Sequence, residues 1–143
     1  MSAMGGDLSG LCVLDLFAGS GALGLEALSR GASRVVFVEC SRSSLRVLEA
    51  NIEHLGASAE VTVVTDDVFK YVRSLSPDAF DIALADPPYA TGDAERLVEA
   101  YRKKSFANAL WLEHPWREEL PLPDDARTRR YGDTALSTLT PES

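Results

Sequence analysis

The sequence is poor in cysteine and has no long apolar run. Cys12 and Cys40 are the only cysteines in 143 residues, and their surroundings lack the ligand spacing of a metal site. No apolar stretch approaches the length that spans a membrane, and residues 1–6 have neither the basic nor the apolar region of a signal peptide. These absences argue against a membrane or secreted protein. They predict a cytoplasmic protein without a metal, in which both cysteines are small buried residues.

Basic residues are also scarce, with 14 lysines and arginines against 22 aspartates and glutamates and a net charge of −8. That balance argues against a general nucleic-acid binder, which usually carries a basic footprint. Two short basic clusters, at 102–104 and 127–130, are interpreted as solvated charges at a helix end and a strand edge, with phosphate contacts as the alternative.

Length and composition fit one globular domain, because 143 residues of which 45% are hydrophobic can bury a substantial core. The sequence shows no internal repeat and no second domain. Residues 1–9 are small, glycine-rich and acidic, which predicts a disordered leader ahead of a single domain over 10–143.

The chain is organised around residues 11–24, LCVLDLFAGSGALG. The apolar beginning predicts a buried strand, the glycines predict a loop, and the pattern after them predicts a helix that ends at Gly31. Strand, glycine loop and helix form the first unit of a doubly wound α/β sheet. Gly19, Gly21 and Gly24 also match the dinucleotide-binding fingerprint GxGxxG, although the same glycines can serve close packing alone.

Two acidic residues narrow the choice of ligand. Asp15 lies inside the apolar strand, where a carboxylate is costly to bury unless loop N–H groups or a ligand's amino group partner it. A nicotinamide or flavin dinucleotide has little use for that acid. Glu39 ends a second predicted strand, 34–39, and an acid there reaches ribose hydroxyls, with a solvated charge as the alternative. Together they favour a ligand that has a ribose, an amino group and a carboxylate.

Residues 15–21, DLFAGSG, followed by Gly24, Glu26 and Ala27, resemble the S-adenosylmethionine loop of class I methyltransferases. Read with Asp86-Pro87-Pro88-Tyr89, the chain resembles the bacterial family that methylates N2 of a guanine in small-subunit ribosomal RNA. The resemblance implies a Rossmann-like, doubly wound α/β sheet, mostly parallel with an antiparallel C-terminal strand. It also implies S-adenosyl-L-methionine as the cofactor. The implied cofactor-binding residues are Asp15, Phe17, Ala18, Gly19, Ser20, Gly21, Glu39, Cys40, Asp67, Val68 and Asp86.

An acidic pair, Asp66 and Asp67, follows a third predicted strand over 61–65. A carboxylate in that loop can accept a hydrogen bond from an adenine amine, and Val68 could cover the face of the ring. In the resembled family, Asp67 aligns with the adenine-binding position. The alternative is that the pair caps the short helix predicted over 68–75, and one residue can do both.

The motif Asp86-Pro87-Pro88-Tyr89 supplies the predicted catalytic residues and follows a buried strand over 80–85. Two prolines cannot continue a ladder, so the backbone leaves the sheet at the edge where open α/β sheets bind ligands. The Asp86 carboxylate and the Pro87 carbonyl can accept hydrogen bonds from an exocyclic amine and direct its lone pair at the sulfonium methyl. Tyr89 can stack on an extruded base. A structural proline turn would explain the prolines but not the flanking Asp and Tyr.

The rest of the chain predicts two more helices and an antiparallel end. Ser41 or Ser43 caps a helix that reaches about residue 55, and Thr91 or Asp93 caps one that reaches about residue 104. After a strand over 109–114, His114 and Trp116 are expected to pack locally. Strands over 127–131 and 135–139 form a hairpin that matches the closing strands of class I methyltransferases, in which the seventh strand inserts beside the fifth.

The leading interpretation is methyl transfer from S-adenosylmethionine to N2 of a guanine in 16S-type ribosomal RNA, by a monomer acting on a partly assembled small subunit. Alternatives are transfer to adenine N6 or a glutamine amide, a nicotinamide-dependent oxidoreductase, and a cofactor-binding module without turnover. The last alternative stays open because the resembled family carries a basic N-terminal region, thought to dock RNA, that is missing here. The acidic balance favours a preformed particle, whose proteins can supply basic contacts.

Overall fold

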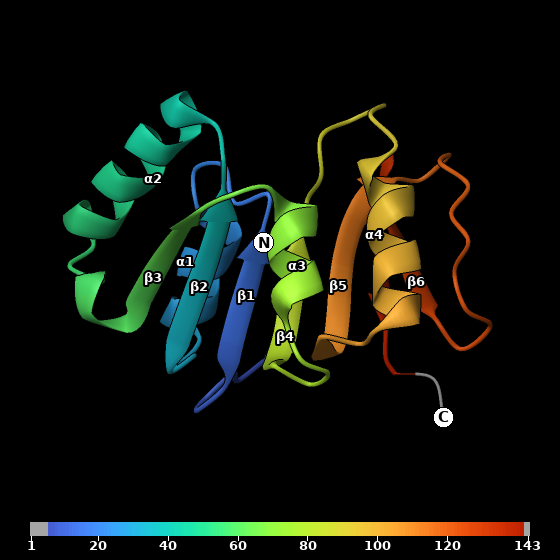
Figure 1. The fold of residues 1–143 in the computed structure, drawn as a ribbon, viewed down its shortest axis with the longest axis horizontal. Coiled ribbons are helices and arrows are strands. Elements are labelled where there is room, and N and C mark those ends of the chain that lie inside the picture. The colour runs from blue at the N-terminus through green and yellow to red at the C-terminus, as the bar shows by residue number, and fades with distance from the viewer. Residues whose placement is uncertain (1–5, 142–143) are drawn as a thin grey trace.

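The computed structural model describes residues 6–141, which form one seven-stranded sheet with helices on both faces (Figure 1). The elements in chain order are β1 (Cys12–Leu16), α1 (Ala22–Ser29), β2 (Arg34–Glu39), α2 (Arg42–His54), η2 (Ser58–Glu60), β3 (Val61–Thr65), α3 (Val68–Ser74), β4 (Phe80–Ala85), α4 (Asp93–Lys103), β5 (Ala107–Pro115), β6 (Arg127–Tyr131) and β7 (Thr134–Leu139). The strand order is β3-β2-β1-β4-β5-β7-β6. Strands β1 to β5 are parallel, whereas β7 runs antiparallel to both β5 and β6. This arrangement confirms the predicted fold class and the insertion of the seventh strand beside the fifth.

The inner strands form from apolar, β-branched runs because helices bury both faces of a parallel sheet. In β2, RVVFVE, the four central residues are buried. The edge strand β6, RTRRY, is exposed throughout, and its charges oppose pairing with another chain. The predicted bounds of β2, β3 and β4 are confirmed, whereas β5 begins earlier and ends later than predicted.

The helices begin and end largely where the sequence predicts. Ser41 occupies the N-cap of α2, where its hydroxyl accepts the N–H of Ser44 at 3.4 Å. The predicted cap of α4 is wrong, because the N-cap position is Gly92 with φ +81, which a residue with a side chain rarely adopts. The Thr91 hydroxyl instead accepts the N–H of Asp93 at 3.2 Å, inside the first turn.

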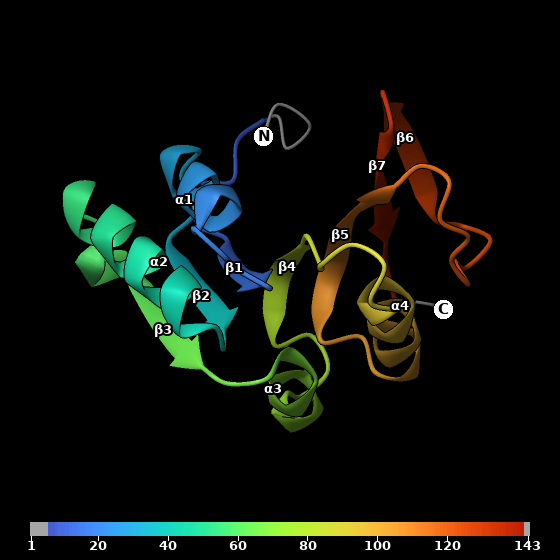
Figure 2. The same cartoon turned by 90° about the horizontal axis from the view of Figure 1, so that it is seen from above.

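Two apolar cores lie on opposite faces of the sheet. Helices α1 and α2 cover one face and α3 and α4 cover the other (Figure 2). On the first face, the buried side chains of Leu45, Leu48 and Ile52 from α2 pack in the same core as Phe37 of β2. The second core gathers the apolar sides of α3 and α4 against β1, β4 and β5.

The chain reverses its direction of travel across the sheet between β1 and β4. It moves outward from β1 to β3 and then crosses back to β4 on the other side of β1. Open α/β sheets bind ligands outside the carboxyl ends of their strands at such a point. Leu16 pairs with Ala85, so the two segments that follow, beginning at Phe17 and at Asp86, leave the sheet side by side.

The disordered leader predicted over residues 1–9 lies partly outside the described residues, which begin at Gly6. Leu8 is buried, and its N–H donates to the carbonyl of Arg30 at 2.9 Å, at the end of α1. The chain is therefore packed against the domain from Leu8 onward. None of the helices within residues 6–141 is both long and apolar enough to cross a membrane.

Candidate active site

Four acidic residues lie at the carboxyl ends of neighbouring strands. Asp15 is in β1, Glu39 ends β2, Asp67 follows β3 and Asp86 follows β4. Because these four strands are parallel and adjacent, all four residues lie along one edge of the sheet. The edge coincides with the reversal point between β1 and β4, so the structure brings the predicted cofactor residues and the predicted catalytic motif together.

The loop between β1 and α1 is fixed by backbone hydrogen bonds to neighbouring elements. The N–H of Ala18 donates to the carbonyl of Val38 in β2 at 3.1 Å, and the carbonyl of Ser20 accepts from Asn51 of α2 at 2.9 Å. Phe17 adopts φ +57, which is uncommon for a residue with a side chain, and its ring meets Phe69 edge-on at 5.9 Å between centroids. The loop is therefore held in shape before any ligand binds.

The three glycines of the fingerprint differ in what requires them. A Cβ on Gly21 would collide with Leu48, and one on Gly24 would collide with the Phe37 ring, so both glycines are needed for close packing of α1. An added Cβ on Gly19 meets nothing nearer than the Phe17 carbonyl oxygen at 4.0 Å. Gly19, with φ +57, thus leaves the loop open where a ligand can approach the backbone.

Asp15 is only 1% exposed although its side chain is acidic. Its Oδ2 accepts the N–H of Gly24 at 3.0 Å. Burial raises the pKa of Asp15 well above the usual range, and this outweighs the Gly24 hydrogen bond, which lowers it. The negative charges of Asp86 and Glu39 raise the pKa of Asp15 further. A buried acid near two other acids is a place where a cation on a ligand would be stabilised.

The Glu39 carboxylate holds the glycine loop against β2. Its Oε1 accepts the N–H of Gly19 at 2.7 Å, while Oε2 accepts those of Cys40 at 3.0 Å and Ser41 at 2.9 Å. The predicted contact of Glu39 with ribose hydroxyls stays a prediction. The predicted burial of Cys40 is wrong, because β2 ends at Glu39 and Cys40 is exposed in the loop beyond the sheet; Cys12 in β1 is partly buried.

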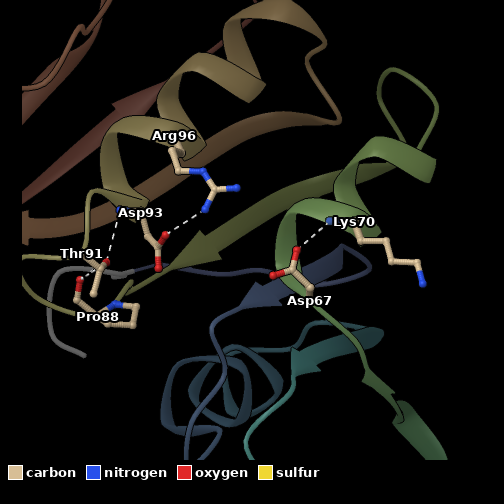
Figure 3. A network of polar contacts seen from close by, with 6 residues as sticks. All are labelled: Asp67, Lys70, Pro88, Thr91, Asp93 and Arg96. Atoms are coloured by element: carbon tan, nitrogen blue, oxygen red, sulfur yellow. Dashed lines mark hydrogen bonds and ion pairs between the residues drawn. The ribbon is translucent and has the colours of Figure 1, made fainter.

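Asp67 caps helix α3, as the alternative interpretation predicted. Its Oδ1 accepts the N–H of Lys70 at 3.0 Å (Figure 3). The adenine contact predicted for Asp67 stays a prediction. Val68, predicted to cover the adenine ring, is buried at 5% exposure and contributes to the core beneath α3.

The segment after β4 lines a cavity of about 650 Å³. Asp86, Pro87 and Tyr89 contribute to its wall, and the Tyr89 side chain is 77% exposed. The carbonyl of Pro88 accepts a hydrogen bond from the Thr91 hydroxyl at 3.1 Å, which ties the motif to the start of α4 (Figure 3). An exposed aromatic ring beside a cavity is available to stack on a planar ligand.

Acidic groups near this cavity have altered proton affinities. The Asp86 side chain reaches solvent, but partial burial of its carboxyl raises the pKa of Asp86. Burial also raises the pKa of Glu113 on β5, and the negative charge of Asp86 raises it further. Of the two, Asp86 lines the cavity, and a group with a raised pKa in a cavity is characteristic of a functional site.

The remainder of the wall comes from the end of β5 and from the β6–β7 hairpin: His114, Pro115, Arg117, Asp133 and Thr134. His114 is buried, with Nδ1 2.9 Å from the carbonyl of Pro115 and Nε2 2.7 Å from the Ser137 hydroxyl on β7. Because a carbonyl only accepts, Nδ1 carries a proton. His114 thus packs locally, as predicted, while it also borders the cavity.

A turn fixed to the hairpin presents Arg117 to the cavity. The N–H of Trp116 donates to the carbonyl of Asp133 at 2.8 Å, and the N–H of Glu118 donates to the carbonyl of Pro115 at 3.1 Å. Arg117 is exposed and makes no ion pair or side-chain hydrogen bond within residues 6–141. No sequence motif points to Arg117, Asp133 or Thr134, because they join the site only when the hairpin folds back beside β5.

Comparisons with known proteins agree with this geometry. The family model described as Conserved hypothetical protein 95 matches residues 2–139. The presumed rRNA methyltransferase YlbH of Bacillus subtilis is 30% identical over 87% of this chain and 72% of its own length. Ribosomal RNA small subunit methyltransferase D of Buchnera aphidicola is 26% identical over 77% of this chain, which spans only 59% of that relative. The solved structure of a conserved hypothetical protein from Streptococcus pyogenes matches with a TM-score of 0.84 and 29% identity, over 99% of this chain and 92% of that one.

Proposed function

The chain belongs to the Conserved hypothetical protein 95 family, and we propose that it is an S-adenosylmethionine-dependent methyltransferase acting on N2 of a guanine in small-subunit ribosomal RNA. The observation that carries the proposal is the convergence of three carboxylates, Asp15, Glu39 and Asp86, at the reversal point of the sheet. S-adenosylmethionine has a cationic amino group and a cationic sulfonium, which such a site stabilises. A dinucleotide would bring negatively charged phosphates to the same edge, where these carboxylates repel them.

The residues at the edge fit the parts of this cofactor. Asp15 would hold the amino group, Glu39 the ribose hydroxyls and Asp67 the adenine amine. Gly19 leaves room for the ligand over the loop, since nothing packs where its side chain would be. The assignment of Phe17, Ala18, Ser20, Cys40 and Val68 to the same site rests on their place in or beside these loops. When bound, S-adenosylmethionine supplies an electrophilic methyl group.

The motif after β4 would activate the amine that receives the methyl group. An exocyclic amine on a base is a poor nucleophile because its lone pair is delocalised into the ring. Hydrogen bonds from its two N–H groups to the Asp86 carboxylate and the Pro87 carbonyl favour the pyramidal form. Transfer of the methyl group would break its bond to sulfur as the N–C bond forms, and the amine would lose one proton, which the Asp86 carboxylate, with its raised pKa, is suited to receive. Pro88 shapes the turn, and Tyr89 stacks on the base.

The charged groups of the cavity favour guanine over adenine or a glutamine amide. Guanine presents N–H donors at N2 and N1 beside an acceptor at O6. Asp86 and Asp133 can accept from such donors, and the unpaired Arg117 guanidinium can donate to O6. Adenine with its N6 amine beside Asp86 would place C2–H, which accepts no hydrogen bond, where guanine places O6, so the base would offer Arg117 no acceptor.

A methyl-transfer assay tests this function. Tritiated methyl transfer from S-adenosylmethionine to small-subunit ribosomal RNA, followed by mapping of the product, is expected to yield N2-methylguanine. Asp86→Ala should lower transfer by about 10²–10³-fold, the usual loss of a group that acts on the transition state, with little change in cofactor affinity by calorimetry. Parallel losses of affinity and turnover, or preferential binding of a nicotinamide dinucleotide, would contradict the proposal.

A further inference from the structure

The face of the molecule covered by α3 and α4 carries a groove of about 290 Å³ between the two helices. We call it the α3–α4 groove and define it by its lining residues: Phe69, Val72, Arg73, Arg96, Glu99, Ala100, Lys103, Lys104 and Phe106. Four of these residues are cationic and one is anionic, in a chain whose net charge is −8. We propose that this groove binds the phosphate backbone of the RNA, an inference that rests on the proposed function.

The cations of the groove are largely available to an external anion. Arg73 and Lys103 are exposed and have no ion pair or side-chain hydrogen bond within residues 6–141. The Lys104 ammonium donates to the carbonyl of Arg73 at 2.9 Å, which joins the ends of the two helices but leaves its charge uncompensated. The groove thus concentrates positive charge that the protein itself does not neutralise.

Arg96 is already oriented for an anion. Its guanidinium lies 3.9 Å from the centroid of the Phe69 ring, and one nitrogen is 3.4 Å from Asp93 Oδ1. Figure 3 shows the side chain reaching from the first turn of α4 in the direction of α3. Stacking uses the face of the guanidinium, so its edge can still donate N–H groups to a phosphate.

Helix electrostatics alone do not account for this arrangement. Arg73 and Lys103 lie in the last turns of their helices, where a cation complements the helix dipole. Arg96 lies in the first turn of α4, where the dipole disfavours a cation. A shared ligand for cations from both helices explains their convergence more completely than separate capping effects do.

The groove suits a nucleic acid better than a protein partner. Its apolar members are already buried, with Phe69 at 6%, Val72 at 2% and Phe106 at 1% exposure. A stable protein interface buries about 800 Å² per partner around an apolar centre, and this groove offers little apolar surface. Its polar side chains are mostly guanidinium and ammonium groups, which match phosphates.

Helix α4 connects the groove to the candidate active site. Helix α4 follows the catalytic motif after a short loop, and Thr91 links that loop to its first turn. From Asp93 to Lys103 the helix rises roughly 15 Å at 1.5 Å per residue, so the cations extend down this face from the start of α4. An RNA strand with a base beside Asp86 would follow this face over about that length to contact Arg73, Lys103 and Lys104 at the C-terminal ends of the helices.

Salt dependence of RNA binding tests the assignment. The probe is a fluorescein-labelled 15-nucleotide oligouridylate, bound to the full chain with S-adenosylhomocysteine present. In the triple variant Arg73→Gln, Lys103→Gln and Lys104→Gln, the slope of log affinity against log salt concentration should fall by about 2, because each lost contact to single strands removes about 0.7. Affinity at the lowest salt should fall by roughly tenfold or more.

A matched control carries the same loss of three charges away from the groove. Arg46→Gln, Arg127→Gln and Arg129→Gln alter exposed residues of α2 and β6 and should leave the slope nearly unchanged. Calorimetric binding of S-adenosylhomocysteine checks that both variants are folded. An unchanged slope in the groove variant, or equal losses in both variants, overturns the assignment. A wild-type chain that binds RNA through the groove but transfers no methyl group would refute the proposed function and leave the groove standing.

Discussion

At the scale of single residues, the burial of Asp15 at the sheet edge reduces the stability of the fold. Asp15 is buried with one backbone donor from Gly24 and has Glu39 and Asp86 nearby, so its ionised form is disfavoured in the folded protein. Its pKa is raised on folding, so between the ordinary value and the raised one the folded protein binds more protons than the unfolded chain. The free energy of unfolding due to this group therefore falls as the pH rises through that window.

The variant Asp15→Asn separates these two roles. Asparagine can still accept the Gly24 N–H but carries no charge, so we expect the loss of stability at rising pH to be reduced. At pH 7 the variant should unfold at the same or a higher temperature than the wild type. Its affinity for S-adenosylmethionine should fall by about 1.5–3 kcal/mol, as for a lost hydrogen bond to a charged group. Thermal unfolding between pH 4 and 8 measures the change in stability, and calorimetry measures the change in affinity. A variant that is less stable than the wild type but binds S-adenosylmethionine equally well would contradict both expectations.

Arg117 gives a second residue-scale prediction, on base choice. If its guanidinium donates to O6, the wild type should favour guanine over 2-aminopurine, which keeps the N2 amine but lacks O6 and the N1–H. Arg117→Ala should lower the rate on guanine by about 5–150-fold, equivalent to 1–3 kcal/mol, and should reduce the preference to the part that N1–H provides. Initial rates on RNA carrying either base at the mapped position provide the measurement. Arg46→Ala, on exposed α2, is the control, and an equal loss on both bases would exclude O6 as the partner of Arg117.

At the scale of elements, the position of α1 depends on a close approach to β2. Gly24 faces the Phe37 ring and Val35, both fully buried, and no side chain fits between the helix and the strand. The same Gly24 supplies the N–H that Asp15 accepts. The packing of α1 and the geometry of the glycine loop between β1 and α1 are therefore coupled through Gly24.

Gly24→Ala tests this coupling. Alanine favours helix by roughly 1 kcal/mol, yet its methyl group must displace the ring or the helix, and overpacking of a core typically costs about 1–3 kcal/mol. We expect a net loss of stability in urea unfolding together with weaker S-adenosylmethionine binding. Ser29→Ala, on the exposed side of α1, should change stability by less than about 0.5 kcal/mol. A variant with lower stability but unchanged cofactor affinity would show that the two are independent.

At the scale of the whole molecule, charge is distributed unevenly over an acidic protein. The carboxylates gather at the carboxyl edge of the sheet, whereas four cations gather between α3 and α4. A net charge of −8 opposes long-range attraction to RNA, so local contacts must provide affinity.

This balance predicts a preference for an assembled substrate. In a partly assembled small subunit, ribosomal proteins already neutralise part of the phosphate charge and supply basic surfaces. We expect faster methyl transfer to such particles than to protein-free ribosomal RNA, and a steeper decline with salt for the free RNA. Initial rates on both substrates between 50 and 200 mM salt decide the question, and equal rates with equal salt dependence would contradict the prediction.

Much of the fold followed from local patterns. Apolar runs, glycine breaks and capping residues predicted five strands and a closing hairpin, because burial on both faces and the loss of a ladder at proline act over a few residues. The mostly parallel order was implied by the family resemblance and is confirmed. The N-cap of α4 and the exposure of Cys40 were predicted wrongly. Both depend on how the chain turns beyond the sheet, which neighbouring loops decide.

The sequence by itself determined the order of the elements, the glycine loop with Asp15, and the motif from Asp86 to Tyr89, since each is encoded within one short segment. Only the tertiary structure decided which distant groups join them. Arg117 and Asp133 line the same cavity as Asp86 because β7 inserts beside β5. Arg73 and Lys103 line the same groove because α3 and α4 cover the same face. Such neighbours are set by long-range packing of apolar faces, which places exposed charges together without leaving any periodic trace in the sequence.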